Sequence, residues 1–365
     1  MPESLTEAQQ ALQQRANEFA QSLSAIDAEN AHQLVVQASK DAGFFTMTQP
    51  PQNGEQPAGT LELTIVREAL AAANAPHQGF VFGPGPGVLA GAGEPLASSH
   101  LRPLLAGEKR GAFGFTEPDD AEHPTRAKDD GDAWIVTGQK SYVTGGADAD
   151  FINTLVQIED QGPGMLVIDT TAQGVAITRR FQSLDGSHHA AFSFEGVRVP
   201  KSHLIGQPGE GLPRAMRQIG DTRLAIAATC VGWMLWVTAA TQRHIEAPDR
   251  SGKPRAAKEG VRLRYADMRI KTFAARSMLY RAARLADAGE NVVNEGIMCK
   301  VYASEAVTEV VDTAIQLVGG GALVESHPLA RLYRQVRSMR LAEGASDVLR
   351  LNLVRGNLEL GKGRL

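Results

Sequence analysis

The sequence predicts an α+β protein in which helical segments come before and after a β-rich central region. Residues 5–42, residues 61–74 and the chain from residue 214 onward carry apolar side chains at helical spacing. Residues 113–199 instead consist of short β-rich runs separated by Gly and Asp. The chain has 365 residues, which exceeds one typical hydrophobic core, so we expect two or three packed units.

The N-terminal part predicts helices followed by a turn. Residues 5–42 are expected to form two helices, with Phe19, Leu23 and Ile26 on one apolar face. The run GPGPG at residues 83–87 resembles a phosphate-binding loop in its glycine content, but proline has no N–H to donate to a phosphate. We therefore predict a helix-breaking turn at this point.

The central region predicts a small antiparallel β-barrel or β-sandwich, because Gly and Asp interrupt its β-rich runs at short intervals. The expected strands are residues 134–137, 151–158, 165–169, 175–178 and 191–195. His188 and His189 lie just before the last of these strands. Two adjacent histidines without a third ligand at suitable spacing do not predict a metal site.

The C-terminal part predicts long helices that bury one face each. The expected helices are residues 214–245, 258–288, 292–318 and 346–360. Two apolar stripes are expected to be buried: Val310, Ala314 and Leu317 in one helix, and Leu351, Val354 and Leu358 in another.

Composition excludes several classes of protein. The net charge is only -4 and no Lys/Arg cluster stands out, so we expect neither nucleic acid nor a membrane surface as a partner. Cys230 and Cys299 both lie in apolar helical sequence, which favours a reducing compartment over a disulfide framework. The apolar run at residues 224–237 is too short to span a bilayer, and the first ten residues have no signal-peptide core. These features predict a cytoplasmic enzyme or binding protein.

Two segments combine an apolar strand with a hydroxyl at the strand end: Phe115-Thr116-Glu117-Pro118 and the run GQKSYVT at residues 138–144. Loops at strand ends are where ligands usually bind, although an ordinary β-hairpin has the same local pattern. The segments resemble the T-E-P and G-x-K-x-[WY]-[IV]-T motifs of the acyl-CoA dehydrogenase family, in the same order and at the same spacing. The resemblance implies a bound FAD. The residues expected to line its isoalloxazine ring are Phe115 and Thr116 on one side and Tyr142, Val143 and Thr144 on the other, with Thr144 near the ring nitrogen that receives hydride.

Residues 334–350 resemble the family segment that carries the catalytic base, and Glu343 occupies the base position. A carboxylate beside a flavin and an acyl chain loses water, which raises its pKa toward a range useful for a general base. Gly344 follows and lets the backbone come close to a ligand. From the residues alone, Glu343 is better explained as a solvated acid or a residue in the first turn of a helix than as a base. Thr222-Arg223 matches the family's T-R near bound CoA, so Arg223 is an implied substrate contact. Gly344, beside the base, is the second implied substrate contact.

The run QLVGGG at residues 316–321 resembles the family's Q-x-x-G-G-x-G segment. In the family, this helix end reaches the FAD of a neighbouring subunit. The resemblance therefore implies cofactor contacts by Gln316 and Gly320, and a homodimer or homotetramer. From the residues alone, the pattern is a helix followed by a glycine cap.

Three positions that usually contact the FAD diphosphate depart from the family pattern. Glu122 stands in a run where relatives have Gly and Ser, no arginine falls in register within residues 247–254, and Ala345 replaces a frequent Thr. A carboxylate is unfavourable where a phosphate approaches, so Glu122 is expected to point away or to pair with a cation. These departures favour weaker FAD binding or substitute contacts, and they are the best support for a non-catalytic partner subunit of the same fold.

Further matches at residues 194–200 and 204–211 complete the resemblance. It implies an acyl-CoA dehydrogenase-like fold, with an N-terminal helical domain (1–110), a central β-domain (111–212) and a C-terminal four-helix domain (213–365). The implied reaction is α,β-desaturation of an acyl-CoA thioester, in fatty acid or acyl-CoA metabolism, with an electron-transfer flavoprotein as electron acceptor. The alternatives are an acyl-CoA oxidase, which gives its electrons to oxygen, and the non-catalytic partner subunit.

Overall fold

The computed structural model describes residues 4–26, 30–51 and 57–361. The chain forms two compact units, one made of Met1–Phe82 with Gly220–Leu365 and one made of Gly83–Ile219. Helices dominate the first unit and a β-sheet dominates the second. The α+β class predicted from the sequence is confirmed. The three domains expected from the sequence, with their bounds, stay a prediction.

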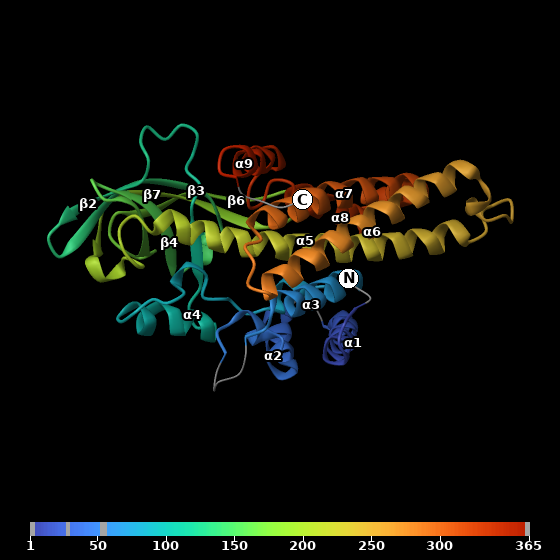
Figure 1. Cartoon of the computed structure of the whole chain (residues 1–365), viewed down its shortest axis with the longest axis horizontal. Helices are drawn as coiled ribbons and strands as arrows, with labels where there is room; N and C mark the ends of the chain where they lie inside the picture. Colours follow the sequence, from blue (N-terminus) through green and yellow to red (C-terminus); the bar gives the residue numbers. More distant parts are fainter. Residues whose placement is uncertain (1–3, 27–29, 52–56, 362–365) are drawn as a thin grey trace. The chain divides into compact units, whose positions relative to one another are not determined.

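One seven-stranded sheet forms the body of the unit Gly83–Ile219 (Figure 1). Its order is β1-β4-β2-β3-β7-β6, with β5 paired to β4. The strands are β1 (Gly111–Gly114), β2 (Arg126–Asp130), β3 (Ala133–Thr144), β4 (Phe151–Ile158), β5 (Gly162–Asp169), β6 (Val175–Gln182) and β7 (His188–Pro200). All five expected strands are present within these bounds.

The sheet is mixed, which corrects the expectation that its strands are all antiparallel. β1 and β2 both run parallel to β4, whereas the remaining pairs are antiparallel. The β2–β3 hairpin lies between β1 and β4 in the chain, and this long connection lets β4 return in the same direction as β1. Alternate residues of β3 and β7, such as Trp134, Val136 and Phe192, pack into the core of the sheet.

Helices make up the described part of the other unit. The first three are α1 (Glu7–Ser22), α2 (Ala31–Ala42) and α3 (Thr60–Ala72). The helix α5 (Gly211–Glu246) begins in the sheet unit and continues into the helical one. It is followed by α6 (Glu259–Asp287), α7 (Val293–Val318), α8 (Pro328–Met339) and α9 (Ser346–Leu358). The buried faces expected for the N-terminal helix and for α7 are confirmed, since Phe19, Leu23, Val310 and Ala314 all lie in the core.

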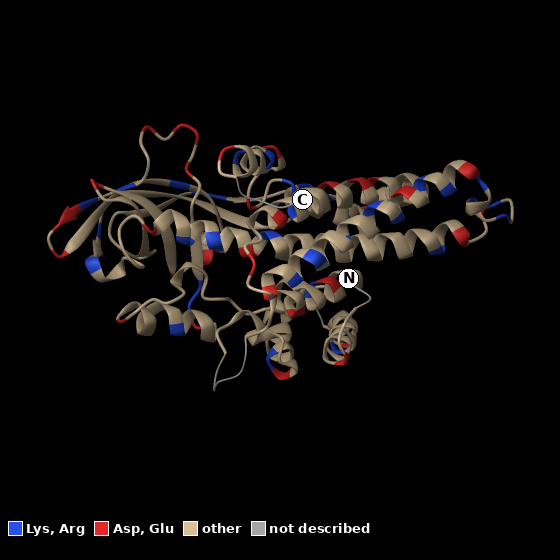
Figure 2. Cartoon of the chain, in the orientation of Figure 1, with Lys and Arg blue, Asp and Glu red and all other residues tan. Residues whose placement is uncertain are grey.

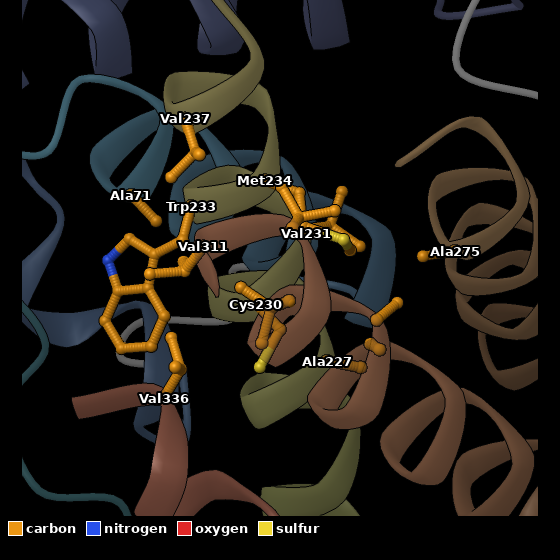
Figure 3. Packing of buried hydrophobic residues seen from close by; sticks show 14 of the residues in the cluster. Ala71, Ala227, Cys230, Val231, Trp233, Met234, Val237, Ala275, Val311 and Val336 are labelled. Atoms are coloured by element: carbon orange, nitrogen blue, oxygen red, sulfur yellow. The ribbon is translucent and has the colours of Figure 1, made fainter. Parts of the chain in front are cut away.

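The largest hydrophobic cluster surrounds α5 (Figure 3). Cys230, Trp233 and Met234 of α5 pack with Val311 of α7 and Val336 of α8. Both cysteines are buried and free, and burial raises the pKa of each thiol to about 12. By length and composition α5 could also cross a membrane, a test that the core helix of a soluble protein passes as well. Removing this apolar surface from water is the main force that stabilises the bundle.

The final helix corrects one expectation. Leu351, Val354 and Leu358 are 72%, 53% and 77% exposed, although their spacing predicted a buried stripe. The helix α9 instead packs through Leu349 and Leu353 onto α7. Periodicity identifies an apolar stripe but does not tell what covers it. In this protein, no described part of the chain covers the stripe.

Charged side chains of both signs are interspersed along α6 and α7 (Figure 2). Lys271 of α6 pairs with Glu309 of α7 at 2.7 Å on the outside of the bundle. A mixed surface of this kind does not attract a polyanion strongly. It agrees with the low net charge of the sequence.

Candidate active site

A buried ion pair holds the loop after β1 against β3. Lys140 Nζ donates hydrogen bonds to the carboxylate of Glu117 at 2.7 Å and to the carbonyl oxygen of Phe115 at 3.2 Å. The Ser141 N–H donates to the carbonyl oxygen of Thr116 at 2.8 Å. These bonds bring together the two segments that the sequence singled out, residues 115–117 and 140–144.

Burial and mutual attraction have opposite effects on the pKa values of Glu117 and Lys140. Burial alone would raise the pKa of Glu117, but hydrogen bonds from Lys140 and from the Thr125 N–H hold it below its ordinary value. Burial also lowers the pKa of Lys140, whose side chain is only 1% exposed, and Glu117 partly offsets that effect. Each charge is therefore tolerated because the other is present.

Two irregularities in β3 set the direction of the side chains after Lys140. The pairing with β7 shifts register between Val136 and Gly138 and again between Lys140 and Val143. Gly138 has φ of 148°, and a Cβ there would lie 2.5 Å from the Thr125 Cα, so this close approach requires glycine. Such bulges re-aim side chains and are frequent beside functional sites.

The second bulge separates Tyr142 from its neighbours. Tyr142 has φ of 53° and is 65% exposed, whereas Val143 is 0% exposed and lies in the core of the sheet. Val143 has no surface with which to line a ligand, which corrects that part of the sequence prediction. Its buried side chain instead fixes the end of β3, including the neighbouring Tyr142 and Thr144, to the core of the sheet. Thr116 and Thr144 are both exposed, and Phe115 is half-buried, stacked on Phe113.

A chain of hydrogen bonds extends from Thr144. Its hydroxyl lies 3.2 Å from Nδ1 of His189, and Nε2 of His189 lies 2.9 Å from the hydroxyl of Ser187. Ser187 in turn donates to the carboxylate of Asp185 at 2.6 Å. The ring of Phe181 stacks on His189 and meets Tyr142 edge-on, with centroids 5.4 Å apart in both cases. An open hollow of about 390 Å³ adjoins this network and is lined by Ala147, Asp148, Arg180, Phe181, Gln182, His188 and His189.

The candidate base lies in the loop between α8 and α9, in the helical unit. Glu343 is half-buried with φ of 53°, and Gly344 has φ of 108°. The helix α9 begins only at Ser346, so Glu343 is not a residue of its first turn. A non-glycine residue in the left-handed region is strained, and such strain is frequently found at functional sites.

Two buried cations hold this loop. Arg223 Nε of α5 donates to the carbonyl oxygen of Glu343 at 3.2 Å. Lys300 Nζ of α7 donates to the carbonyl oxygens of Gly344 at 2.7 Å and Arg340 at 3.2 Å. Burial raises the pKa of Glu343, and the charges of Arg223 and Lys300 oppose that rise. Burial also lowers the pKa of Lys300 to about 8.

The remaining predicted residues lie at accessible positions. Gln316, near the end of α7, and Gly320, just beyond it, are both exposed. Glu122 is exposed as well. Residues 247–254 form a loop closed by a bridge between Pro248 and Pro254.

Comparison with known proteins gives matches along most of the chain. Residues 112–197 match the model of the acyl-CoA dehydrogenase middle domain, and residues 209–358 match that of the acyl-CoA dehydrogenase C-terminal domain. Together the two models cover more than half of the chain. The chain belongs to the acyl-CoA dehydrogenase family.

Individual relatives agree with this assignment. The mitochondrial short-chain specific acyl-CoA dehydrogenase of Bos taurus is 30% identical over 71% of this chain and 65% of its own length. A 3-(aryl)acrylate reductase of Clostridium sporogenes is 27% identical over 86% of this chain and 87% of its own. A chain of a solved structure described as an electron transferring flavoprotein of Acidaminococcus fermentans is 26% identical, with a TM-score of 0.82 over 97% of this chain and 99% of that one. The protein is therefore a flavin-dependent oxidoreductase, and its cofactor is FAD.

The side chains around β3 fit a flat aromatic cofactor with a polar edge. Ser141 is buried, and its Oγ has no hydrogen-bond partner within the described residues. Tyr142 presents an exposed aromatic ring next to it, and the hydroxyls of Thr116 and Thr144 are exposed nearby in the same segment pair. This donor set suits the isoalloxazine ring of an acyl-CoA dehydrogenase. The individual contacts of Phe115, Thr116, Tyr142 and Thr144 with the ring stay predictions.

Sequence reasoning missed the residues that support the site. Lys140 lies inside a recognised motif, but nothing in its spacing indicated that it pairs with Glu117. Lys300 is a lysine in an otherwise apolar helical run, which is itself a signal for a buried charge with a special role. His189 was weighed only as a metal ligand, and its contact with Thr144 depends on cross-strand pairing between β3 and β7.

Proposed function

We propose that the protein catalyses the α,β-dehydrogenation of an acyl-CoA thioester, with Glu343 as the general base. The environment of Glu343 carries this proposal. Its carboxyl group has a pKa raised by burial and stands in a strained loop fixed by Arg223 and Lys300. A base in a fixed position with a raised pKa suits removal of a weakly acidic proton. A surface carboxylate would have neither property.

The reaction breaks two C–H bonds of the substrate. The carboxylate of Glu343 takes the proton from the α-carbon, the β-hydrogen leaves as hydride, and a C=C bond forms between the two carbons. When bound, FAD supplies the hydride-accepting chemistry. A Cβ at Gly344 would lie 3.0 Å from Leu349 Cδ2, so glycine lets the loop beside the base pack closely, and Arg223 provides a cation at the loop. Both remain proposed substrate contacts.

The proposal includes partners and a location. We expect an electron-transfer flavoprotein to reoxidise the enzyme, because one relative is named as a subunit of a caffeyl-CoA reductase-Etf complex. We expect a homodimer or homotetramer in which Gln316 and Gly320 contact the FAD of another copy. The exposed face of α9 supports association, as do Leu263, Ile270 and Phe273 of α6, which are 61%, 63% and 67% exposed. Two free buried thiols support a cytoplasmic location.

The direct test is the visible absorption of the purified protein under anaerobic conditions, before and after addition of a panel of saturated acyl-CoA thioesters. We expect at least one thioester to bleach the flavin, and the thioester that does so identifies the substrate class. Rapid return of the colour with air alone would indicate an oxidase. A yellow protein that no thioester bleaches would contradict the proposed reaction. A protein that does not bind FAD would favour the non-catalytic partner subunit.

A second candidate is the same chemistry in the reducing direction. The 3-(aryl)acrylate reductase that resembles this chain over most of its length favours this alternative. The same panel separates the two directions when α,β-unsaturated thioesters are added to chemically reduced protein. Rapid reoxidation by an unsaturated thioester, without bleaching by any saturated one, would assign the protein as a reductase.

The pH dependence of flavin reduction should report Glu343 and its neighbour Lys300. The carboxylate form of Glu343 is the active base, so the rate is expected to rise with pH as this group ionises. Lys300→Met removes a positive charge that lowers the pKa of Glu343, and we therefore expect the acid limb to move to higher pH. Lys271→Met is the matched control, because Lys271 pairs with Glu309 on the outside of the bundle. An acid limb that stays in place in Lys300→Met, or moves to lower pH, would show that Glu343 is not the titrating group.

A further inference from the structure

Three metal-ligating side chains, none of them discussed so far, converge in the sheet unit. They are His100 in the π-helical turn η6 (Ala97–Leu101), Asp169 at the end of β5, and His203 at the end of the short helix η8 (Lys201–His203). One ligand atom from each residue lies within 4.8 Å of the other two. The three segments are remote in sequence, so the sequence offered no spacing motif.

The hydrogen bonds of both histidines are those of imidazoles prepared to bind a metal. His203 Nδ1 lies 3.0 Å from the carbonyl oxygen of Val167, which fixes the tautomer with the proton on Nδ1 and leaves the lone pair on Nε2. His100 Nδ1 lies 2.8 Å from the Ser99 hydroxyl, which donates to the carbonyl oxygen of Pro95 and can accept from Nδ1–H, so Nε2 can bind a metal once it releases the proton it shares with Asp169. Metal-binding histidines almost always donate their second ring nitrogen to such an acceptor.

His100 and Asp169 already stand at a separation close to that of two ligands on one ion. His100 Nε2 lies 3.0 Å from Oδ1 of Asp169, and two ligands at about 2.1 Å from a tetrahedral ion are roughly 3.4 Å apart. Without a metal, a proton joins these two atoms. A metal would replace that proton, which would pass to solvent, and would keep the carboxylate charge compensated.

The surroundings leave the site open to an ion from solvent. His100 is 2% exposed and lies against the edge of Phe151, whereas the Asp169 side chain is 40% exposed and opens the site to solvent. The positive charge of Lys109 acts on both Asp169 and His203 and opposes a cation. An ion that binds here must therefore gain its affinity from coordinate bonds to the three ligands, because the electrostatic potential of the surrounding charges does not attract a cation.

We infer that His100, Asp169 and His203 form a binding site for a divalent transition metal, with Zn²⁺ the best match. Two imidazoles and one carboxylate suit Zn²⁺, and a water molecule would complete four-coordination. Because the site joins η6, β5 and η8, an ion bound there stabilises the folded sheet unit by mass action. The site shares no residue with the candidate base or with the predicted flavin contacts.

The test is a titration of the FAD-loaded protein, freed of metal with a chelator, with Zn²⁺ in competition with a chromophoric chelator. We expect one Zn²⁺ per chain, and a loss of affinity of roughly 10- to 100-fold or more in His203→Ala and in Asp169→Asn. His123→Ala removes an exposed histidine of the same unit and should bind as the wild type does. Zn²⁺ should also raise the Tm of the wild type and of His123→Ala, but not that of the two ligand variants.

Retention of FAD by each variant shows that it is folded. Asp169→Asn keeps the side-chain size and an oxygen acceptor for His100, so it tests the site even if His203→Ala loses FAD. Equal Zn²⁺ affinity in the wild type and in a folded ligand variant would overturn the inference. The absence of stoichiometric binding by the wild type would overturn it as well.

Discussion

Replacement of Glu343 by Gln is expected to lower the rate of anaerobic flavin reduction by about 10²- to 10⁴-fold, the usual contribution of a positioned general base. Gln keeps the size of the side chain, but its amide cannot accept the α-proton. The backbone of residue 343 is held by Arg223 through its carbonyl oxygen, and that bond does not depend on the carboxylate. The loop should therefore keep its conformation, and the FAD absorption spectrum should match that of the wild type. Stopped-flow absorption with a substrate from the bleaching panel measures the effect.

Glu325→Gln is the control for this substitution. Glu325 lies in the same unit, its side chain is 85% exposed, and it pairs with Arg334 on the surface. Its replacement changes the charge of the protein by the same amount and should leave the rate unchanged. A Glu343→Gln variant that reduces flavin at nearly the wild-type rate would remove Glu343 from the mechanism. An equal loss in Glu325→Gln would show that net charge, and not the base, controls the rate.

Replacement of Lys140 by Met is expected to produce the largest loss of stability. The substitution leaves the carboxylate of Glu117 partly buried and without its cation, although Thr125 still donates to it. It also leaves the carbonyl oxygen of Phe115 without its bond from Lys140. Breaking a buried pair by removing one partner costs about 3–5 kcal/mol, and the 27% exposure of Glu117 places this case near the lower end. The loop at residues 115–117 also loses its attachment to β3, so FAD content should fall. Urea unfolding and the ratio of flavin to protein absorbance measure the two effects.

Two further variants define the cause of that loss. Lys140→Met combined with Glu117→Gln removes the uncompensated charge, and it should recover part of the lost free energy of unfolding. Arg355→Met breaks an exposed pair between Arg355 of α9 and Glu359, the residue after this helix, and should leave stability unchanged. A Lys140→Met protein as stable as the wild type would show that the pair is not needed to hold the loop.

The predictable parts of the fold were those in which hydrophobic pattern and burial coincide. The long helices α5, α6 and α7 and the strand Phe151–Ile158 follow directly from apolar periodicity. The strand β2 has the sequence RAKDD and exposes all but one of its residues, so it carries no apolar signal. The helix α8 does carry one, at Leu329, Leu332 and Val336, and this spacing runs directly into the segment that contains the base motif.

The sequence predicted those residues of the candidate site whose role follows from the residue type and its neighbours in the chain. It did not predict residues whose position depends on strand pairing or helix packing. Glu343 and Gly344 could be placed together from adjacent positions in the chain. Val143 could not be told from Tyr142, because a bulge reverses the direction of the side chains between Lys140 and Val143. The support of the base loop by Lys300 depends on how α7 packs near that loop, which no local pattern encodes.

The most direct measurement of the central claim follows the α-hydrogen itself. A thioester with no hydrogen on its β-carbon cannot complete the reaction, so loss of deuterium from its α-carbon to water reports proton removal alone. We predict that the wild-type protein exchanges this deuterium and that Glu343→Gln does so about 10²- to 10⁴-fold more slowly. Exchange at the same rate in both proteins would contradict the assignment of Glu343 as the base.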